Sequence, residues 1–152
     1  MEEREISAVD NKALSVNKVM VVEDEYIIAL DLKDRLSRLG YIVPTIATSG
    51  KEAVKLAKKD KPDLILMDIM LRGEIDGVQA AKSIRERFDV PVLFVSSFSD
   101  INSVKRAQKV SPYGYLVKPF TETELKGGIE EAFRKHQRKT AKKFIDNIKV
   151  ML

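Results

Sequence analysis

The chain has 152 residues, about the length of one average domain, and its composition of 44% hydrophobic and 33% charged residues is typical of a globular protein. The absence of cysteine excludes disulfides, thiolate metal sites and cysteine nucleophiles, and a single histidine, His136, argues against a zinc site or a Ser-His-Asp triad. No run approaches the roughly 18 apolar residues of a membrane helix, and the N-terminus is acidic where a signal peptide is basic. We therefore expect a cytoplasmic protein without a membrane contact.

The formal net charge of +4 is unevenly distributed. Residues 136–152 carry an excess of basic side chains, whereas residues 1–17 are acidic. A short basic tail can bind nucleic acid, but it more often forms a solvated helix face. We therefore expect no direct nucleic-acid binding.

Five short apolar segments are predicted to be strands. Several are apolar at nearly every position, which is typical of strands buried on both faces of a parallel sheet. They are Lys18–Val22, Tyr41–Ile46, Leu64–Met67, Val90–Val95 and Tyr113–Val117.

An amphipathic segment follows each strand and is predicted to be a helix. Gly40 ends the first helix, Ser49 and Asp76 are N-cap candidates for the next two, and Thr121 with Glu124 forms a capping box before the last. The apolar stripes lie in Tyr26–Leu39, Ala53–Ala57, Val78–Phe88, Ile101–Val110 and Leu125–Phe133. Gly127 and Gly128 interrupt the last stripe at a local cost of about 1 kcal/mol each, for which the sequence offers no reason.

The alternation of strand and helix five times over residues 18–135 predicts an α/β fold. We expect a doubly wound five-stranded parallel sheet of order 2-1-3-4-5 between two helix layers, the flavodoxin-like arrangement. Residues 1–17 are interpreted as a flexible leader. Residues 136–152 continue the helical spacing as an extension of the last helix or the stub of a linker. Its apolar stripe could pack back on the domain or pair with another chain, and we favour the second.

In an open α/β sheet, ligands bind beyond the carboxyl ends of the strands. The polar residues expected at that edge are Glu23, Asp24 and Glu25 after the first strand, Asp68 after the third, Ser96 and Ser97 after the fourth, and Lys118 with Pro119 after the fifth. Clustered carboxylates repel one another and need a cation, and hard oxygen ligands suit Mg²⁺. A carboxylate beside Mg²⁺, a lysine and a hydroxyl fits phosphoryl transfer, with Asp68 as the nucleophile that forms an acyl phosphate.

Five motifs, each at a strand or loop boundary, give the chain a family resemblance. They are VVEDE (Val21–Glu25), LILMD (Leu64–Asp68), DG (Asp76–Gly77), PVLFVSS (Pro91–Ser97) and GYLVKPF (Gly114–Phe120). In this order they resemble the receiver domain of two-component response regulators, over about residues 18–135.

The resemblance implies a role for each matching residue. Asp68 would accept a phosphoryl group from a phosphohistidine of a sensor histidine kinase or a phosphotransfer protein. Asp24, Glu23, Asp68 and the backbone carbonyl of Met70 would bind Mg²⁺. Lys118 would pair with the phosphoryl group, and the peptide bond from Lys118 to Pro119 would be cis.

The resemblance also implies a conformational switch. Ser96 would turn toward the phosphoryl group, and Tyr115 would move inward. The face made by the fourth helix, fifth strand and fifth helix would then change its partner preference, and a homodimer through this face is usual in the family. Such a domain is no enzyme beyond its own phosphorylation and dephosphorylation.

Three residues depart from the family pattern or flank the site. Arg72 stands where the family often has proline, and the loop from Arg72 to Gly77 is one residue longer than usual; we expect the Arg72 side chain to be solvated. Met70 and Phe98 are apolar and cannot orient a water, which predicts slow hydrolysis of the acyl phosphate. His136 is expected to be an exposed helix residue.

Other functions fit the sequence less well. A pseudo-receiver that binds partners without phosphorylation is possible in principle, but every residue that carries the chemistry is present. An aspartyl phosphatase needs a second acid two residues after the nucleophile, where this chain has Met70. A flavin-binding flavodoxin lacks its phosphate loop after the first strand. The residues after 135 are too few for an output domain, so the chain is either a stand-alone receiver or a piece of a larger regulator.

Overall fold

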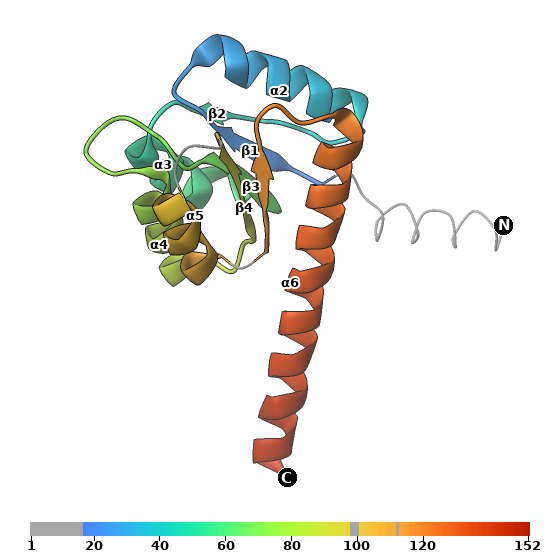
Figure 1. Ribbon diagram of the computed structural model, residues 1–152. Helices are drawn as coiled ribbons and strands as arrows, with labels where there is room; N and C mark the ends of the chain where they lie inside the picture. Colours follow the sequence, from blue (N-terminus) through green and yellow to red (C-terminus); the bar gives the residue numbers. More distant parts are fainter. Residues whose placement is uncertain (1–16, 98–100, 112) are drawn as a thin grey trace, which may run out of the picture.

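The computed structural model describes residues 17–97, 101–111 and 113–152. Five parallel strands form one sheet in the order β2-β1-β3-β4-β5, with helices on both faces (Figure 1). The strands are β1 (Val19–Val22), β2 (Ile46–Ala47), β3 (Leu64–Asp68), β4 (Val92–Ser96) and β5 (Tyr115–Val117). The predicted fold class and strand order are confirmed.

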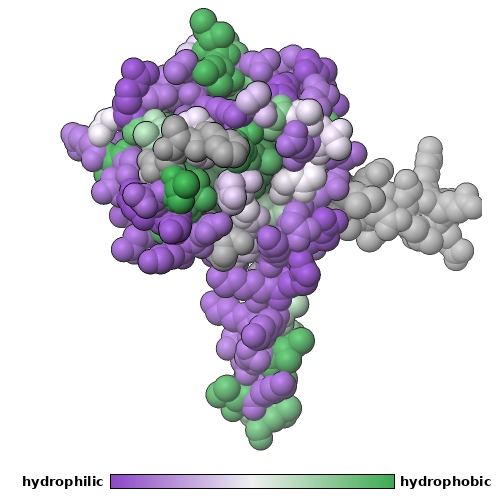
Figure 2. Space-filling model, in the orientation of Figure 1, coloured by the Kyte–Doolittle hydropathy of each residue, from purple (hydrophilic) through white to green (hydrophobic). Residues whose placement is uncertain are grey.

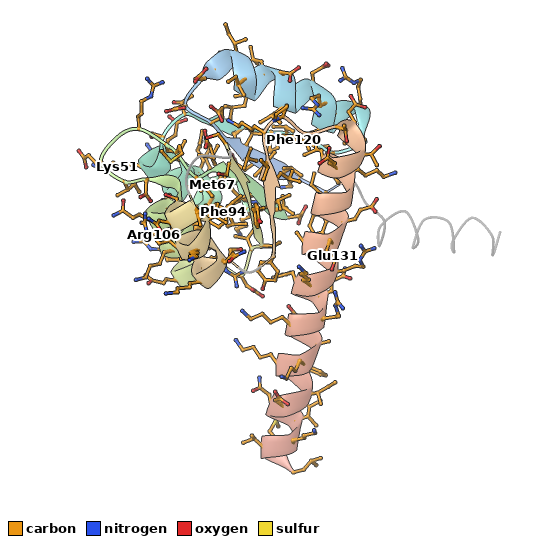
Figure 3. All side chains as sticks on the ribbon, viewed as in Figure 1. Lys51, Met67, Phe94, Arg106, Phe120 and Glu131 are labelled. Atoms are coloured by element: carbon orange, nitrogen blue, oxygen red, sulfur yellow. The ribbon has the colours of Figure 1, made fainter. Side chains whose placement is uncertain are left out.

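The helices alternate with the strands along the chain. They are α2 (Tyr26–Arg38), α3 (Gly50–Asp60), α4 (Gly77–Arg87), α5 (Ile101–Val110) and α6 (Glu122–Met151). Helices α2 and α6 cover one face of the sheet, and α3, α4 and α5 cover the other (Figure 1). Met67 and Phe94 lie in the core layer beneath α3, α4 and α5 (Figure 3). The hydrophobic strands are therefore buried on both sides, which leaves their carboxyl ends as the place for polar chemistry.

The predicted caps begin three helices. The Ser49 side chain accepts a hydrogen bond from the backbone N–H of Glu52. Asp76 and Thr121 each form a complete capping box, at α4 and α6 respectively. Each cap satisfies backbone donors that the first helical turn leaves free, so local sequence fixes where these helices start.

The predicted second strand was largely wrong. Only Ile46–Ala47 pairs with β1, although Ile42 makes an isolated bridge to Lys18. Pro44 lies between them and has no N–H to donate to a strand neighbour, so the ladder is interrupted there.

Helix α6 extends far beyond the sheet (Figure 1). Its buried side chains, Leu125, Ile129 and Ala132, all lie in its first half. Residues 137–152 are exposed throughout, and hydrophobic residues gather near the end of the helix (Figure 2). The continuous helix agrees with the predicted spacing, and its terminal apolar stripe does not pack back on its own domain.

The prediction of an exposed His136 was wrong. Its Nε2 lies 3.0 Å from Asp89 Oδ1, and its ring meets the Tyr113 ring edge-on at 5.7 Å between centroids. Helix α6 passes the amino ends of β4 and β5 at this point, which the helical period alone does not reveal. No helix in the described ranges is both long and apolar enough to cross a membrane.

Candidate functional site

The carboxyl ends of four strands bring the predicted site residues to one edge of the sheet. Glu23 follows β1, Asp68 ends β3, Ser96 ends β4 and Lys118 follows β5. Glu23, Asp68 and Ser96 are buried, with 2%, 7% and 1% of their surface exposed. Parallel pairing aligns these ends, so residues 95 positions apart in sequence become neighbours.

The Lys118 side chain contacts two of the acidic residues at this edge. Its Nζ lies 3.3 Å from Glu23 Oε2 and 3.6 Å from Asp68 Oδ2. The peptide bond between Lys118 and Pro119 is cis, as predicted. One ammonium therefore lies between two buried carboxylates. The sequence analysis predicted that these three distant residues lie at the same edge of the sheet.

The electrostatics of the buried groups follow from this crowding. Burial, together with a hydrogen bond to Asp68 and repulsion from it, raises the pKa of Glu23 to about 7. Burial lowers the pKa of Lys118, but attraction to Asp68 and Glu23 outweighs it and raises that pKa overall. A second cation at this edge would favour the ionised form of Glu23.

Asp24 lies at the outer side of the same edge, with its side chain 12% exposed. Its Oδ2 accepts hydrogen bonds from Arg72 Nε at 2.9 Å and from the Arg72 backbone N–H at 3.2 Å. Burial raises the pKa of Asp24, but these two hydrogen bonds outweigh it and hold that pKa below its ordinary value. The Arg72 side chain is 79% exposed, as expected for a solvated residue, but the sequence gave no sign of its partner.

The acidic residues fit a divalent cation. Carboxylate oxygens of Glu23, Asp24 and Glu25 lie within 4.8 Å of one another. All are hard oxygen donors, the kind that Mg²⁺ prefers. Asp68 stands beside them, and its Oδ1 accepts the backbone N–H of Met70 at 2.9 Å.

Comparisons with known proteins show which family the chain belongs to. Residues 19–130 match the response regulator receiver domain family. The chain belongs to this family. It is 36% identical over 132 residues to the transcriptional regulatory protein PdtaR of Mycobacterium tuberculosis, over 87% of this chain and 64% of that protein. It is 33% identical to the probable transcriptional regulator ycf27 of Guillardia theta, over 84% of this chain and 51% of that protein.

Solved receiver structures show the same fold. The signal receiver domain of a modulated diguanylate cyclase from Desulfovibrio desulfuricans has a TM-score of 0.77 at 37% identity, covering 82% of this chain and 99% of that one. The N-terminal domain of a response regulator/sensory box/GGDEF protein from Carboxydothermus hydrogenoformans has a TM-score of 0.74 at 35% identity, covering 81% and 98%. This receiver chain spans between half and two-thirds of the two curated relatives named above.

The two predicted switch residues of this receiver lie on β4 and β5, and the Ser96 carbonyl accepts the backbone N–H of Lys118 at 2.8 Å. Ser96 Oγ donates a hydrogen bond to the Ser97 carbonyl at 2.7 Å, and Tyr115 is 43% exposed. Both line one pocket of about 280 Å³ against α5. The predicted flanking residue Met70 is 52% exposed, whereas Phe98 lies outside the described residues.

Gly77, from the DG motif, packs against the backbone of the predicted acceptor Asp68 in this receiver. A Cβ added at Gly77 would lie 2.0 Å from the backbone oxygen of Asp68. The first turn of α4 therefore packs directly against the backbone that carries Asp68, and only glycine permits this approach.

Proposed function

We propose that this receiver accepts a phosphoryl group on Asp68 from the phosphohistidine of a sensor histidine kinase or of a phosphotransfer protein. The observation that carries the proposal is the position of Lys118 Nζ between Glu23 and Asp68, at 3.3 and 3.6 Å. Asp24, Glu23, Asp68 and the backbone carbonyl of Met70 are the proposed Mg²⁺ ligands. Mg²⁺, when bound, would neutralise charge on the phosphoryl oxygens.

The proposed transfer to Asp68 is a single displacement at phosphorus. An oxygen of Asp68 attacks phosphorus, the bond from phosphorus to the imidazole nitrogen breaks, and the histidine keeps the electron pair and takes a proton from solvent. Lys118 offsets the negative charge that gathers on the phosphoryl oxygens. Met70, half-exposed beside Asp68, has no group that could orient an attacking water, so we expect slow hydrolysis.

The conformational response proposed for the switch uses the pocket shared by Ser96 and Tyr115. The Ser96 hydroxyl leaves the Ser97 carbonyl for a phosphoryl oxygen, and Tyr115 moves into the space of about 280 Å³. The phosphoryl group thus biases a two-state element on the α5–β5–α6 face. Ile101 and Tyr115 are exposed on this face, which supports a second copy of the chain as its partner after phosphorylation.

The kinase-facing surface is proposed at the start of α2. Tyr26, Ile27 and Leu30 are 58%, 83% and 43% exposed, directly after the acids of the site. Helical spacing alone would place Tyr26 and Leu30 in the core, but the buried residues of α2 are Ala29, Leu32 and Leu36. Exposed apolar residues beside the acceptor can contact the domain that delivers the phosphoryl group.

The function is tested by mass spectrometry after incubation with acetyl phosphate and Mg²⁺. We expect one adduct of ~80 Da that hydroxylamine removes, as an acyl phosphate requires, and that persists for minutes or longer. The Asp68→Asn variant should carry none. A stable adduct on both proteins would contradict the proposal, because the phosphoryl group would then sit on a serine or on His136. The absence of any adduct on the wild type would favour the pseudo-receiver.

A further inference from the structure

Arg72 makes its hydrogen bonds to Asp24, a residue of the acidic cluster at the carboxyl edge. Both the side chain and the backbone N–H of Arg72 donate to the same oxygen, Asp24 Oδ2, at 2.9 and 3.2 Å. Asp24 is one of the proposed Mg²⁺ ligands, and its carboxylate is nearly buried whereas the Arg72 side chain is 79% exposed. An exposed cation therefore pairs with a nearly buried acidic oxygen of the site.

The loop between β3 and α4 holds Arg72 in this position. Beyond Arg72, Gly73 takes a positive φ of 122°, which turns the chain back toward α3. Glu74 then pairs with Lys51 of α3 at 2.5 Å, and Asp76 caps α4 and pairs with Arg106 of α5 at 3.2 Å. Lys51 and Arg106 mark these two anchor helices in Figure 3. The loop is thus fastened after Arg72, while the guanidinium itself can leave for solvent.

The charge of Arg72 acts on the whole acidic cluster. Its hydrogen bond to Asp24 raises the pKa of the guanidinium, and attraction to Glu25 and Glu23 adds to this. Mg²⁺ would need the same Asp24 carboxylate, and a guanidinium next to it both blocks an oxygen and repels a second cation.

We propose that Arg72 competes with Mg²⁺ for Asp24 and so raises the Mg²⁺ concentration that the receiver needs. The inference rests on the proposed metal site and adds a residue that sets its affinity. Metal entry releases the Arg72 side chain to solvent, while the anchored part of the loop stays in place. Phosphoryl loading then needs a higher Mg²⁺ concentration than it would without Arg72, because the competing side chain raises the apparent Kd.

The test is calorimetric titration of the full chain with MgCl₂ at low ionic strength and without a phosphodonor. We expect Arg72→Gln to lower the Kd for Mg²⁺ by roughly three- to tenfold, the effect of removing a competing charge from a largely buried carboxylate. Lys55→Gln is the matched control, because it removes an exposed cation of α3 and leaves the anchors of the loop in place. We expect its Kd to stay close to that of the wild type.

Two further outcomes separate this inference from the proposed function. Asp24→Asn should lose most Mg²⁺ affinity if the metal site is correct. Equal Kd values for the wild type and Arg72→Gln, with weakened binding in Asp24→Asn, would overturn the competition and leave the metal site standing. An absence of binding in all four proteins would overturn both. An equal gain of affinity in Lys55→Gln would also overturn it, since the effect would then be one of net charge.

Discussion

The two edges of the sheet carry charged clusters of opposite character. At the carboxyl edge, defined by Glu23, Asp24, Glu25, Asp68 and Lys118, acids outnumber cations even after the pairing of Asp24 with Arg72. With Glu23 ionised, the four carboxylates exceed Lys118 and Arg72 by two negative charges, which equals the charge of one divalent cation. The excess of negative charge makes this edge suited to bind a cation.

At the amino edge, defined by Arg85, Asp89, Tyr113 and His136, the charged groups satisfy one another. Arg85 donates to the Val90 carbonyl at 2.9 Å and to the Tyr113 hydroxyl at 3.3 Å, and it lies 3.6 Å from Asp89. The hydrogen bond from His136 holds the pKa of Asp89 below its ordinary value. A cluster whose groups pair with one another fastens helix α6, whereas a cluster with excess acid marks a site of chemistry.

The difference between the two edges is tested most strongly by replacing Lys118. We expect Lys118→Ala to slow phosphoryl loading by about 100-fold, because a positioned charge at the transferring group is lost. The measurement is the initial rate of adduct formation from acetyl phosphate, followed by mass spectrometry.

Two controls place this effect at the carboxyl edge. Lys126→Ala removes an exposed lysine of α6 and should load at the wild-type rate. Arg85→Ala at the amino edge should also load normally while it lowers stability. A loss of less than threefold in Lys118→Ala would show that the two edges do not differ in the way that their charges suggest.

The sequence predicted the carboxyl edge better than any other part of the molecule. The ends of β3 and β4 could be predicted because each strand is apolar at every position up to Asp68 or Ser96. Parallel strand order then brings such ends together. The helix caps could also be predicted from the sequence, because a capping box depends on two residues only three positions apart.

Contacts that depend on the path of a loop or helix through space could not be predicted. The pairing of Arg72 with Asp24 spans 48 positions and depends on how the β3–α4 loop turns. His136 meets Asp89 only because α6 crosses the amino edge at that turn. Gly128 also gained a reason from the structure: a Cβ there would lie 3.0 Å from Leu116 of β5, so the glycine lets α6 approach the sheet.

The burial of Glu23 beside Asp68 at the carboxyl edge also predicts a pH-dependent stability. The pKa of Glu23 is raised from 4.5 to about 7, so the folded protein holds this proton more tightly than the unfolded chain does. The stability of the metal-free protein is therefore expected to fall as pH rises from about 4.5 to about 7, by on the order of 2 kcal/mol. Urea unfolding in EDTA at pH 5, 6, 7 and 8 measures this.

Replacement by glutamine isolates the contribution of Glu23. Glu23→Gln should lose the pH-dependent part of the free energy of unfolding and exceed the wild type above pH 7. The exposed acid Glu130 supplies the control, since Glu130→Gln should keep the wild-type slope. A slope that Glu23→Gln leaves unchanged would mean that folding does not raise the pKa of Glu23.

The smallest expected effect concerns a buried polar group at the amino end of β4, where structure alone is at stake. Ser111 is 1% exposed; its hydroxyl donates to the Val92 carbonyl at 2.8 Å and accepts from the Val92 N–H at 3.2 Å. Ser111→Ala leaves that N–H without its partner and should lower the free energy of unfolding by about 1 kcal/mol. The exposed Ser37→Ala should change it far less. Because Val92 and Ser96 lie at opposite ends of β4, loading at Asp68 should keep its rate in Ser111→Ala, and a matching loss of loading would show that the two edges are coupled through this strand.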